Sequence, residues 1–248
     1  MIFVFLFVLG AMVGSFLNVC ISRWPQNQSI VYPPSHCMSC GQSLGGQDLV
    51  PILSYLWLRG KCRSCGVKIP FRYLLVEILS GLIFAGLFFW LPHFPVYIFT
   101  LFFVLLLLVI FFTDLETETI PDQAVFGGII LGLGWAIYQK QFGAAVAAAL
   151  LGYGFFFAVA KIAYWYYKKE AVGEGDFKLA AMLGAGLGWQ GLFFAIFTAY
   201  VLGAAVSIFL VGLKIKTLKD NIPFGPFLAA GAVLFLFFGN TLLRWYFG

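Results

Sequence analysis

Long runs of apolar residues, interrupted by short polar segments, extend over most of this chain. A helix that crosses a membrane completely needs about 20 such residues. The pattern predicts helices at residues 1–22, 74–91, 96–113, 123–138, 142–166 and 226–246, with a further apolar stretch at 177–213. This stretch is too long for one span, and we divide it at Gly188-Trp189-Gln190-Gly191 into a short and a full helix. The sequence therefore predicts an all-α polytopic membrane protein with about eight transmembrane helices.

Composition supports this class of protein. Of the 248 residues, 62% are hydrophobic and only 10% are charged, whereas soluble domains carry about 25% charged residues. The first apolar segment has neither a basic start nor a small-residue cleavage site, which indicates a retained helix. The net charge of +5 does not point to nucleic acid, because the basic residues are spread over loops. We expect membrane lipid around the helices and no nucleic-acid partner.

The distribution of Lys and Arg predicts the orientation of the chain. If the loop 23–73 is cytoplasmic, eight alternating spans place twelve of the 15 basic residues inside. These are Arg23, Arg59, Lys61, Arg63, Lys68, Arg72, Lys168, Lys169, Lys178, Lys214, Lys216 and Lys219. Only Lys140 and Arg244 fall outside, which agrees with the excess of positive charge in cytoplasmic loops. We therefore expect a multi-pass protein of the bacterial cytoplasmic (inner) membrane with both termini outside.

The polar segment 23–73 carries a cysteine pattern typical of a metal site. Cys37 and Cys40 form one Cys-x-x-Cys pair, and Cys62 and Cys65 form a second after 21 residues. Two such pairs at this spacing predict a four-thiolate zinc site, which is structural because no coordination position stays open. Disulfides or free thiols are the alternatives, but a cytoplasmic loop is kept reduced. We predict a first helix at 1–22, a zinc-binding loop domain at 23–73 and a membrane-embedded domain at 74–248.

Two aspartates stand where apolar segments meet water on the predicted cytoplasmic side. Asp114 ends one long apolar run, and Asp176 opens another after Gly173-Glu174-Gly175. The glycines allow an extended peptide substrate to approach Asp176 closely. Paired carboxylates can hydrolyse a peptide bond, because an ionised one activates water and a protonated one gives its proton to the carbonyl oxygen. The pair therefore indicates acid–base chemistry at the membrane surface.

Two other interpretations of the aspartates stay open at this point. Carboxylates in membrane segments can also carry ions or protons through a transporter. An ion- or proton-coupled carrier with a zinc-stapled loop is accordingly the alternative function. Asp176 at a helix start can also be purely structural, because the helix dipole favours an acid there.

The chain resembles the prepilin peptidases, the Gly-x-Gly-Asp aspartyl proteases of bacterial membranes. The resemblance extends over nearly the whole chain and combines six motifs in a fixed order. These are Gly14-Ser15-Phe16-Leu17-Asn18-Val19 with Arg23 and Pro25, the paired Cys-x-x-Cys loop, Arg72-Tyr73 to Glu77, Asp114 with Ile120-Pro121-Asp122, Gly173 to Leu179, and Ile222 to Phe227.

The resemblance implies an enzyme that cuts the basic leader from type IV prepilins and pseudopilins after a glycine, on the cytoplasmic side. It implies Asp114 and Asp176 as the catalytic pair. We expect Gly173, Glu174 and Gly175 to contact the substrate, although Glu174 stands where apolar or small residues are frequent in the family. It also implies N-methylation of the new N-terminal residue with S-adenosylmethionine. The resemblance gives the substrate class, but neither the individual pilin nor an oligomeric state.

Two further expectations concern the methyl donor and the leader. The chain has no glycine-rich cofactor loop of the Rossmann type, so we expect the donor near the zinc loop. Glu77 is a candidate donor-binding residue there, or else a helix-start acid favoured by the dipole. The acids of the predicted cytoplasmic rim would attract a basic leader over long range. They are Asp114, Glu116, Glu118, Asp122, Glu174 and Asp176.

Overall fold

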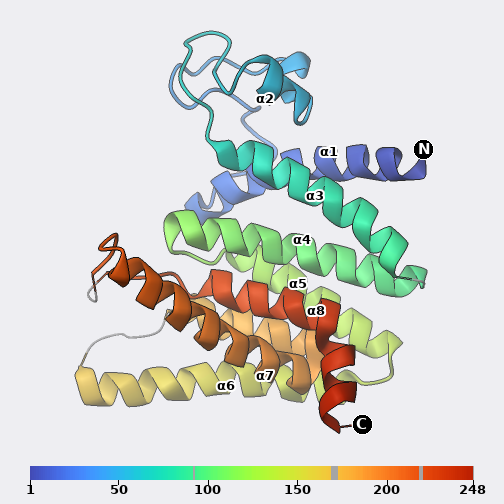
Figure 1. The fold of residues 1–248 in the computed structure, drawn as a ribbon, viewed down its shortest axis with the longest axis vertical. Coiled ribbons are helices and arrows are strands. Elements are labelled where there is room, and N and C mark those ends of the chain that lie inside the picture. The colour runs from blue at the N-terminus through green and yellow to red at the C-terminus, as the bar shows by residue number, and fades with distance from the viewer. Residues whose placement is uncertain (92, 169–172, 218–219, 248) are drawn as a thin grey trace. The chain divides into compact units, whose positions relative to one another are not determined.

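The protein is built of helices, as the apolar pattern predicts (Figure 1). The computed structural model describes residues 1–91, 93–168, 173–217 and 220–247, and these contain no β-strand. Lys169 and Lys219, two of the basic residues expected inside, lie outside the described residues. The helices are α1 Ile2–Arg23, α2 Leu53–Trp57, α3 Phe71–Trp90, α4 Phe94–Thr117, α5 Asp122–Tyr138, α6 Phe142–Tyr167, α7 Glu174–Gly212 and α8 Gly225–Phe247.

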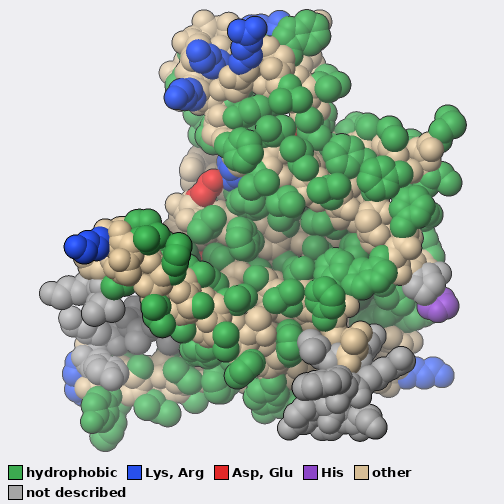
Figure 2. Space-filling model, viewed as in Figure 1, with side chains coloured by type: hydrophobic (Ala, Val, Ile, Leu, Met, Phe, Trp, Pro, Cys, Tyr) green, Lys and Arg blue, Asp and Glu red, His purple; other side chains and the backbone are tan. Residues whose placement is uncertain are grey.

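The helix lengths confirm a polytopic membrane protein. Five helices of the described chain are long and apolar enough to cross a membrane, namely α1, α3, α4, α6 and α7. Two shorter apolar helices, α5 and the first part of α8, add to them. Hydrophobic side chains cover most of the face that Figure 2 shows. With α7 divided as described next, eight apolar helical segments follow one another in the predicted order.

Helix α7 is broken at Gly188, where the sequence pattern predicts a division. Gly188 has φ 69° and ψ −177°, a backbone conformation that only glycine adopts readily. A Cβ on Gly152 of α6 would lie 2.5 Å from the carbonyl oxygen of Ala180 and 3.2 Å from the side chain of Leu192. One position on α6 therefore touches α7 on both sides of the break, as a hairpin of two helix halves requires.

The chain divides into two compact units, Met1–Leu105 and Leu106–Gly248. In the first unit, α1 and α3 pack closely through small residues. A Cβ on Gly10 would lie 2.6 Å from the carbonyl oxygen of Ser80, and one on Gly14 would lie 2.8 Å from Cα of Glu77. Close approach through small residues is a common way for membrane helices to associate. The packing makes α1 and α3 a hairpin, with residues 24–70 as the loop that joins them.

In the second unit, α7 packs against α5, α6 and α8. Glycines again form the contacts: a Cβ on Gly132 of α5 would lie 2.7 Å from the amide nitrogen of Gly186, and one on Gly231 of α8 would lie 2.7 Å from the carbonyl oxygen of Ala195. Two segments of this unit are short. Helix α5 has 17 residues, and the break at Gly188 leaves the first arm of α7, residues 174–187, shorter still.

Candidate active site and metal centre

Asp114 lies in the last turn of α4 and is a buried carboxylate in the second unit. Its side chain is only 5% exposed. The backbone N–H of Gly225, the first residue of α8, donates a hydrogen bond of 2.9 Å to Oδ2 of Asp114. A Cβ on Gly225 would lie 2.5 Å from the same oxygen, so residue 225 has no room for a side chain. The absence of a side chain lets the start of α8 approach the carboxylate closely enough to bind it.

Asp176 lies in the first turn of α7 and is half-buried. The backbone N–H of Asp176 donates to the carbonyl oxygen of Gly173, which is the N-cap residue, over 3.1 Å. The carboxylate is near enough to Asp114 for the two charges to interact. The structure thus brings together the two aspartates that the sequence singles out, in one compact unit.

Ile120 lies between the segments that carry the two aspartates. A Cβ on Gly175 would lie 2.9 Å from Cβ of Ile120, and a Cβ on Gly225 would lie 3.2 Å from Cδ1 of the same side chain. Ile120 therefore contacts both the residue before Asp176 and the residue that hydrogen-bonds Asp114. The missing side chain of Gly175 makes room for Ile120. The predicted contact of Gly175 with the substrate stays a prediction.

Around Gly173 there is more space than around Gly175. Gly173 is exposed, and among the described residues a Cβ there would approach only Oδ2 of Asp176, at 3.8 Å. Glu174 is exposed as well. The open backbone beside Asp176 therefore lies at Gly173 and Glu174.

An ion pair joins the start of α5 to the start of α7. Nζ of Lys178 lies 2.7 Å from Oδ1 of Asp122, between side chains that are 34% and 52% exposed. Lys178 follows Asp176 by half a helical turn, and Asp122 follows Ile120-Pro121 directly. The exposed acids Glu116, Glu118 and Glu174 belong to the same unit, so the candidate active site carries both an ion pair and an excess of acidic groups.

Three residues of this region are not predicted as site residues from the sequence. Gly225 and Ile120 belong only to motifs that carry the family resemblance. Tyr200, in the second half of α7, is close enough to Asp176 for an electrostatic interaction, and its ring lies 5.0 Å from that of Phe224, the residue before Gly225. Hydrophobic periodicity could not distinguish Tyr200 from other aromatic membrane residues. Its proximity to Asp176 depends on the fold of α7 at Gly188.

The four predicted metal ligands form one cluster in the first unit. The sulfurs of Cys37, Cys40, Cys62 and Cys65 all lie within 4.8 Å of one another, and those of Cys37 and Cys65 are 3.8 Å apart. Zinc bound tetrahedrally with bonds of about 2.3 Å needs sulfurs about 3.8 Å apart. The donor set and its size therefore fit a zinc ion.

The two Cys-x-x-Cys segments have the same backbone geometry. Gly41 and Gly66 both have φ 71°, and each donates its N–H to the carbonyl oxygen of the first cysteine of its pair, over 2.9 and 3.0 Å. A positive φ of this kind suits glycine. The turns aim both cysteines of each pair at one point, which explains why each pair is followed by glycine.

The surroundings of the sulfurs favour a bound cation. Backbone amides of Cys40 and Ser39 hold the pKa of the Cys37 thiol below its usual range, at about 6. At Cys65 the amide of Val67 acts in the same direction, but desolvation and the neighbouring sulfurs outweigh it and raise the pKa to about 11. Neighbouring thiols therefore cannot all ionise together without a positive charge between them. A metal cation supplies that charge and deprotonates its thiol ligands.

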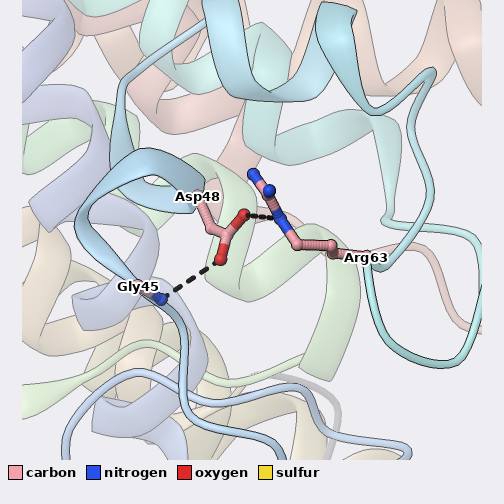
Figure 3. A network of polar contacts seen from close by, with 3 residues as sticks. All are labelled: Gly45, Asp48 and Arg63. Atoms are coloured by element: carbon pink, nitrogen blue, oxygen red, sulfur yellow. Dashed lines mark hydrogen bonds and ion pairs between the residues drawn. The ribbon is translucent and has the colours of Figure 1, made fainter.

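Asp48 ties the loop that carries the four cysteines together at a second point (Figure 3). One carboxylate oxygen accepts the N–H of Gly45 over 3.1 Å, and the other lies 2.8 Å from Nε of Arg63. Arg63 stands between Cys62 and its partner cysteine, whereas Gly45 precedes the short 3₁₀ helix Gly46–Leu49. The carboxylate thus links the second cysteine pair to the segment that follows the first.

Glu77 is buried in α3, where its carboxylate already has a partner. The side chain is 7% exposed, and its Oε2 accepts the backbone N–H of Ile52 over 2.7 Å. Ile52 has φ 65° and ψ −53°, and the N–H of Leu53 donates to the carbonyl oxygen of Pro51 over 2.6 Å. This is a γ-turn of the rare, strained kind. Glu77 therefore holds a strained turn of the zinc loop, and its predicted role toward the methyl donor stays a prediction.

Comparison with known proteins gives two matching family profiles, and no solved structure matches. The profile of the bacterial peptidase A24 N-terminal domain matches residues 8–91, and that of the type IV leader peptidase family matches residues 101–208. The chain is 33% identical, over 98% of its length and 93% of the relative, to a prepilin leader peptidase/N-methyltransferase of Aeromonas hydrophila. Proteins of the same name from Pectobacterium carotovorum subsp. carotovorum and Burkholderia pseudomallei strain 1026b are similar as well. The first is 36% identical over 91% of this chain and 89% of the relative, and the second 34% over 95% and 85%.

Proposed function

Because the chain belongs to the type IV leader peptidase family, we propose that Asp114 and Asp176 are the catalytic carboxylates of a prepilin leader peptidase. The observation that carries this proposal is the burial of Asp114 on the amide of Gly225, within electrostatic reach of Asp176. Buried acids at membrane depth are costly and are typical of functional sites. The pair is the acid–base constellation that peptide hydrolysis needs.

The reaction follows from the two carboxyl groups and one water molecule. One aspartate takes a proton from water while the water oxygen adds to the carbonyl carbon of the glycine at the leader junction. The other aspartate gives its proton to the carbonyl oxygen. The carbon–nitrogen bond then breaks, as the first aspartate gives the proton from water to the departing nitrogen and a hydroxyl of the intermediate returns a proton to the other aspartate. The products are the leader, with a carboxyl group at its glycine, and a pilin with a free N-terminal amine.

Substrate binding is assigned to the segment before Asp176. Gly173 and Glu174 are exposed next to the catalytic carboxylate, where an extended peptide can lie along the backbone, and Gly175 completes the segment. The leader of prepilins is basic, and Glu116, Glu118 and Glu174 are exposed acids of the same unit. Long-range attraction by these charges would raise the rate at which a basic leader arrives.

The second reaction is N-methylation of the new N-terminal residue. The relatives are named N-methyltransferases as well as leader peptidases. The neutral amine attacks the methyl group of S-adenosylmethionine, the sulfur–methyl bond breaks to leave the thioether S-adenosylhomocysteine, and the methylated nitrogen loses a proton. We assign donor binding to the loop between α1 and α3, which zinc holds together through Cys37, Cys40, Cys62 and Cys65. Zinc is structural there, because four sulfurs leave no open coordination position. Glu77 acts in this region by holding the turn at Ile52.

The active site faces the cytoplasm of the bacterial inner membrane in this proposal, and both termini face outward. The support is the distribution of basic residues, with twelve of 15 on the side of the loop 23–73. Such an excess is typical of cytoplasmic loops. The basic leader of a prepilin is held on the same side before cleavage.

The test is cleavage and methylation by the purified protein. A prepilin with a Gly–Phe junction is incubated with and without S-adenosylmethionine, and products are identified by mass spectrometry. Asp114→Asn and Asp176→Asn should each abolish cleavage. Asp220→Asn is the matched control, because Asp220 is exposed and its carboxylate accepts the N–H of Thr217. Cleavage that survives both active-site substitutions would end the assignment, whereas methylation of a pre-cut pilin should persist in both variants.

A further inference from the structure

Helix α2 in the zinc loop has an exposed apolar face. Leu53, Leu56 and Trp57 are 63%, 58% and 87% exposed. Their spacing of i, i+3 and i+4 places them on one side of the helix. Ser54 and Tyr55 are less exposed, and the hydroxyl of Tyr55 donates to the carbonyl oxygen of Ile69 over 3.3 Å. The polar side of α2 is therefore turned to the rest of the loop, and the apolar side is turned away from it.

The attachment of α2 determines its depth relative to the helices that cross the membrane. Ile52, the residue before α2, donates its N–H to Glu77 over 2.7 Å. Glu77 is the seventh residue of α3, and at 1.5 Å per residue it lies about 9 Å inside the start of that helix. The head-group layer on each side of a bilayer is about 5–8 Å thick. The segment that leads into α2 is thus tied to α3 about 9 Å inside the start of that helix, rather than beyond its end.

Basic residues follow the apolar face directly. Arg59, Lys61 and Lys68 are all exposed, and Arg59 has a positive φ of 53° at the end of α2. Figure 2 shows Lys and Arg side chains gathered on the loop segment, next to hydrophobic ones. Cations close to a membrane surface bind anionic lipids, and tryptophan is favoured at the membrane–water interface.

We propose that α2 is an interfacial anchor of the zinc loop in the cytoplasmic leaflet. Leu53, Leu56 and Trp57 insert among the phospholipids, while Arg59 and Lys61 contact anionic head groups. Apolar and aromatic side chains that enter the boundary between head groups and acyl chains, together with cations that attract anionic lipids, bind membrane surfaces in this way. The anchor holds the zinc loop against the bilayer and limits its rotation about the hairpin of α1 and α3. This inference rests on the spans of α1 and α3 and does not depend on the catalytic assignment.

The test uses a photoreactive residue in the full-length protein. Benzoylphenylalanine replaces Leu56 or Trp57, and the protein is reconstituted into vesicles of phosphatidylethanolamine and phosphatidylglycerol. The same residue in place of Met38 is the control, because Met38 is 74% exposed but belongs to the first cysteine pair. Unchanged zinc content in each variant shows that the loop is still folded.

Mass spectrometry after illumination gives the outcome. We expect phospholipid adducts at positions 56 and 57 in roughly tenfold excess over position 38, because only the inserted residues meet acyl chains. Equal adducts at all three positions, or none, would overturn the proposal. A second reaction contains prepilin, and adducts to prepilin in place of lipid at position 57 would also overturn it, because α2 would then be a substrate surface.

Discussion

The backbone N–H of Gly225 donates a hydrogen bond to Oδ2 of Asp114, although 111 residues separate the two in sequence. The contact joins the first turn of α8 to the last turn of α4. It depends on a residue without a side chain, since a Cβ at position 225 would lie 2.5 Å from the carboxylate oxygen.

Gly225→Ala should reduce cleavage about a hundredfold, mainly in kcat, because a displacement of about 1 Å in a catalytic group has this effect. Steady-state kinetics on a prepilin checks the prediction. Gly134→Ala in α5 is the control, because a Cβ there meets nothing within 4 Å. Equal kinetics for Gly225→Ala and Gly134→Ala would show that the contact does not position Asp114.

Ile120 should act as a positioning residue for both aspartates. Ile120→Ala removes the side chain that contacts Gly175 and Gly225, and we expect kcat to fall roughly tenfold while KM changes little. The matched control is Ile130→Ala, because Ile130 is 72% exposed on α5 and touches neither segment. If the two variants cleave alike, Ile120 is only a packing residue.

Removal of the metal should affect methylation more than cleavage. Cys62→Ser or a strong chelator should remove a single zinc ion per chain, measured by elemental analysis, and lower the unfolding temperature of the loop. Cys20→Ala should retain the zinc, because Cys20 is buried in α1 and is not part of the cluster. If the zinc-free protein methylates a pre-cut pilin at the normal rate, the loop does not take part in N-methylation.

The bond between Glu77 and Ile52 should stabilise the strained turn. Glu77→Ala leaves the Ile52 N–H without its acceptor, which costs about 1–3 kcal/mol, so hydrogen exchange of residues 50–54 should become faster. Glu77→Gln retains a carbonyl oxygen at this position and should keep most of the protection. If instead Glu77→Gln abolishes methylation while exchange stays slow, the charge of Glu77 acts directly on the donor.

The division of the apolar stretch at residues 177–213 could be predicted from the sequence, because the stretch is too long for one span and the segment Gly188-Trp189-Gln190-Gly191 interrupts it. The apolar pattern predicts that the second helix begins at residue 74, whereas α3 begins at Phe71. The difference arises because Arg72 is polar, and polarity alone assigns it to the loop. In the structure its Nη2 donates to Oγ of Ser22 over 3.0 Å.

The paired aspartates and the four cysteines were also found from the sequence, since both depend on residue types at short spacing. The contact between Gly225 and Asp114 could not be found in this way, because it joins distant segments and uses a backbone amide. The turn at Ile52 is another such case. A β-branched residue is not expected at a positive φ, and only the buried partner Glu77 explains it.

The short helices of the second unit have a consequence for the surrounding lipid. Helix α5 has 17 residues, which corresponds to a length of about 25 Å, and the first arm of α7 is no longer than this. The hydrocarbon layer is about 30 Å thick, so hydrophobic mismatch should draw the bilayer inward around these helices. Such local thinning would bring the water phase toward the aspartates. Cleavage should then respond to the acyl-chain length of the host membrane.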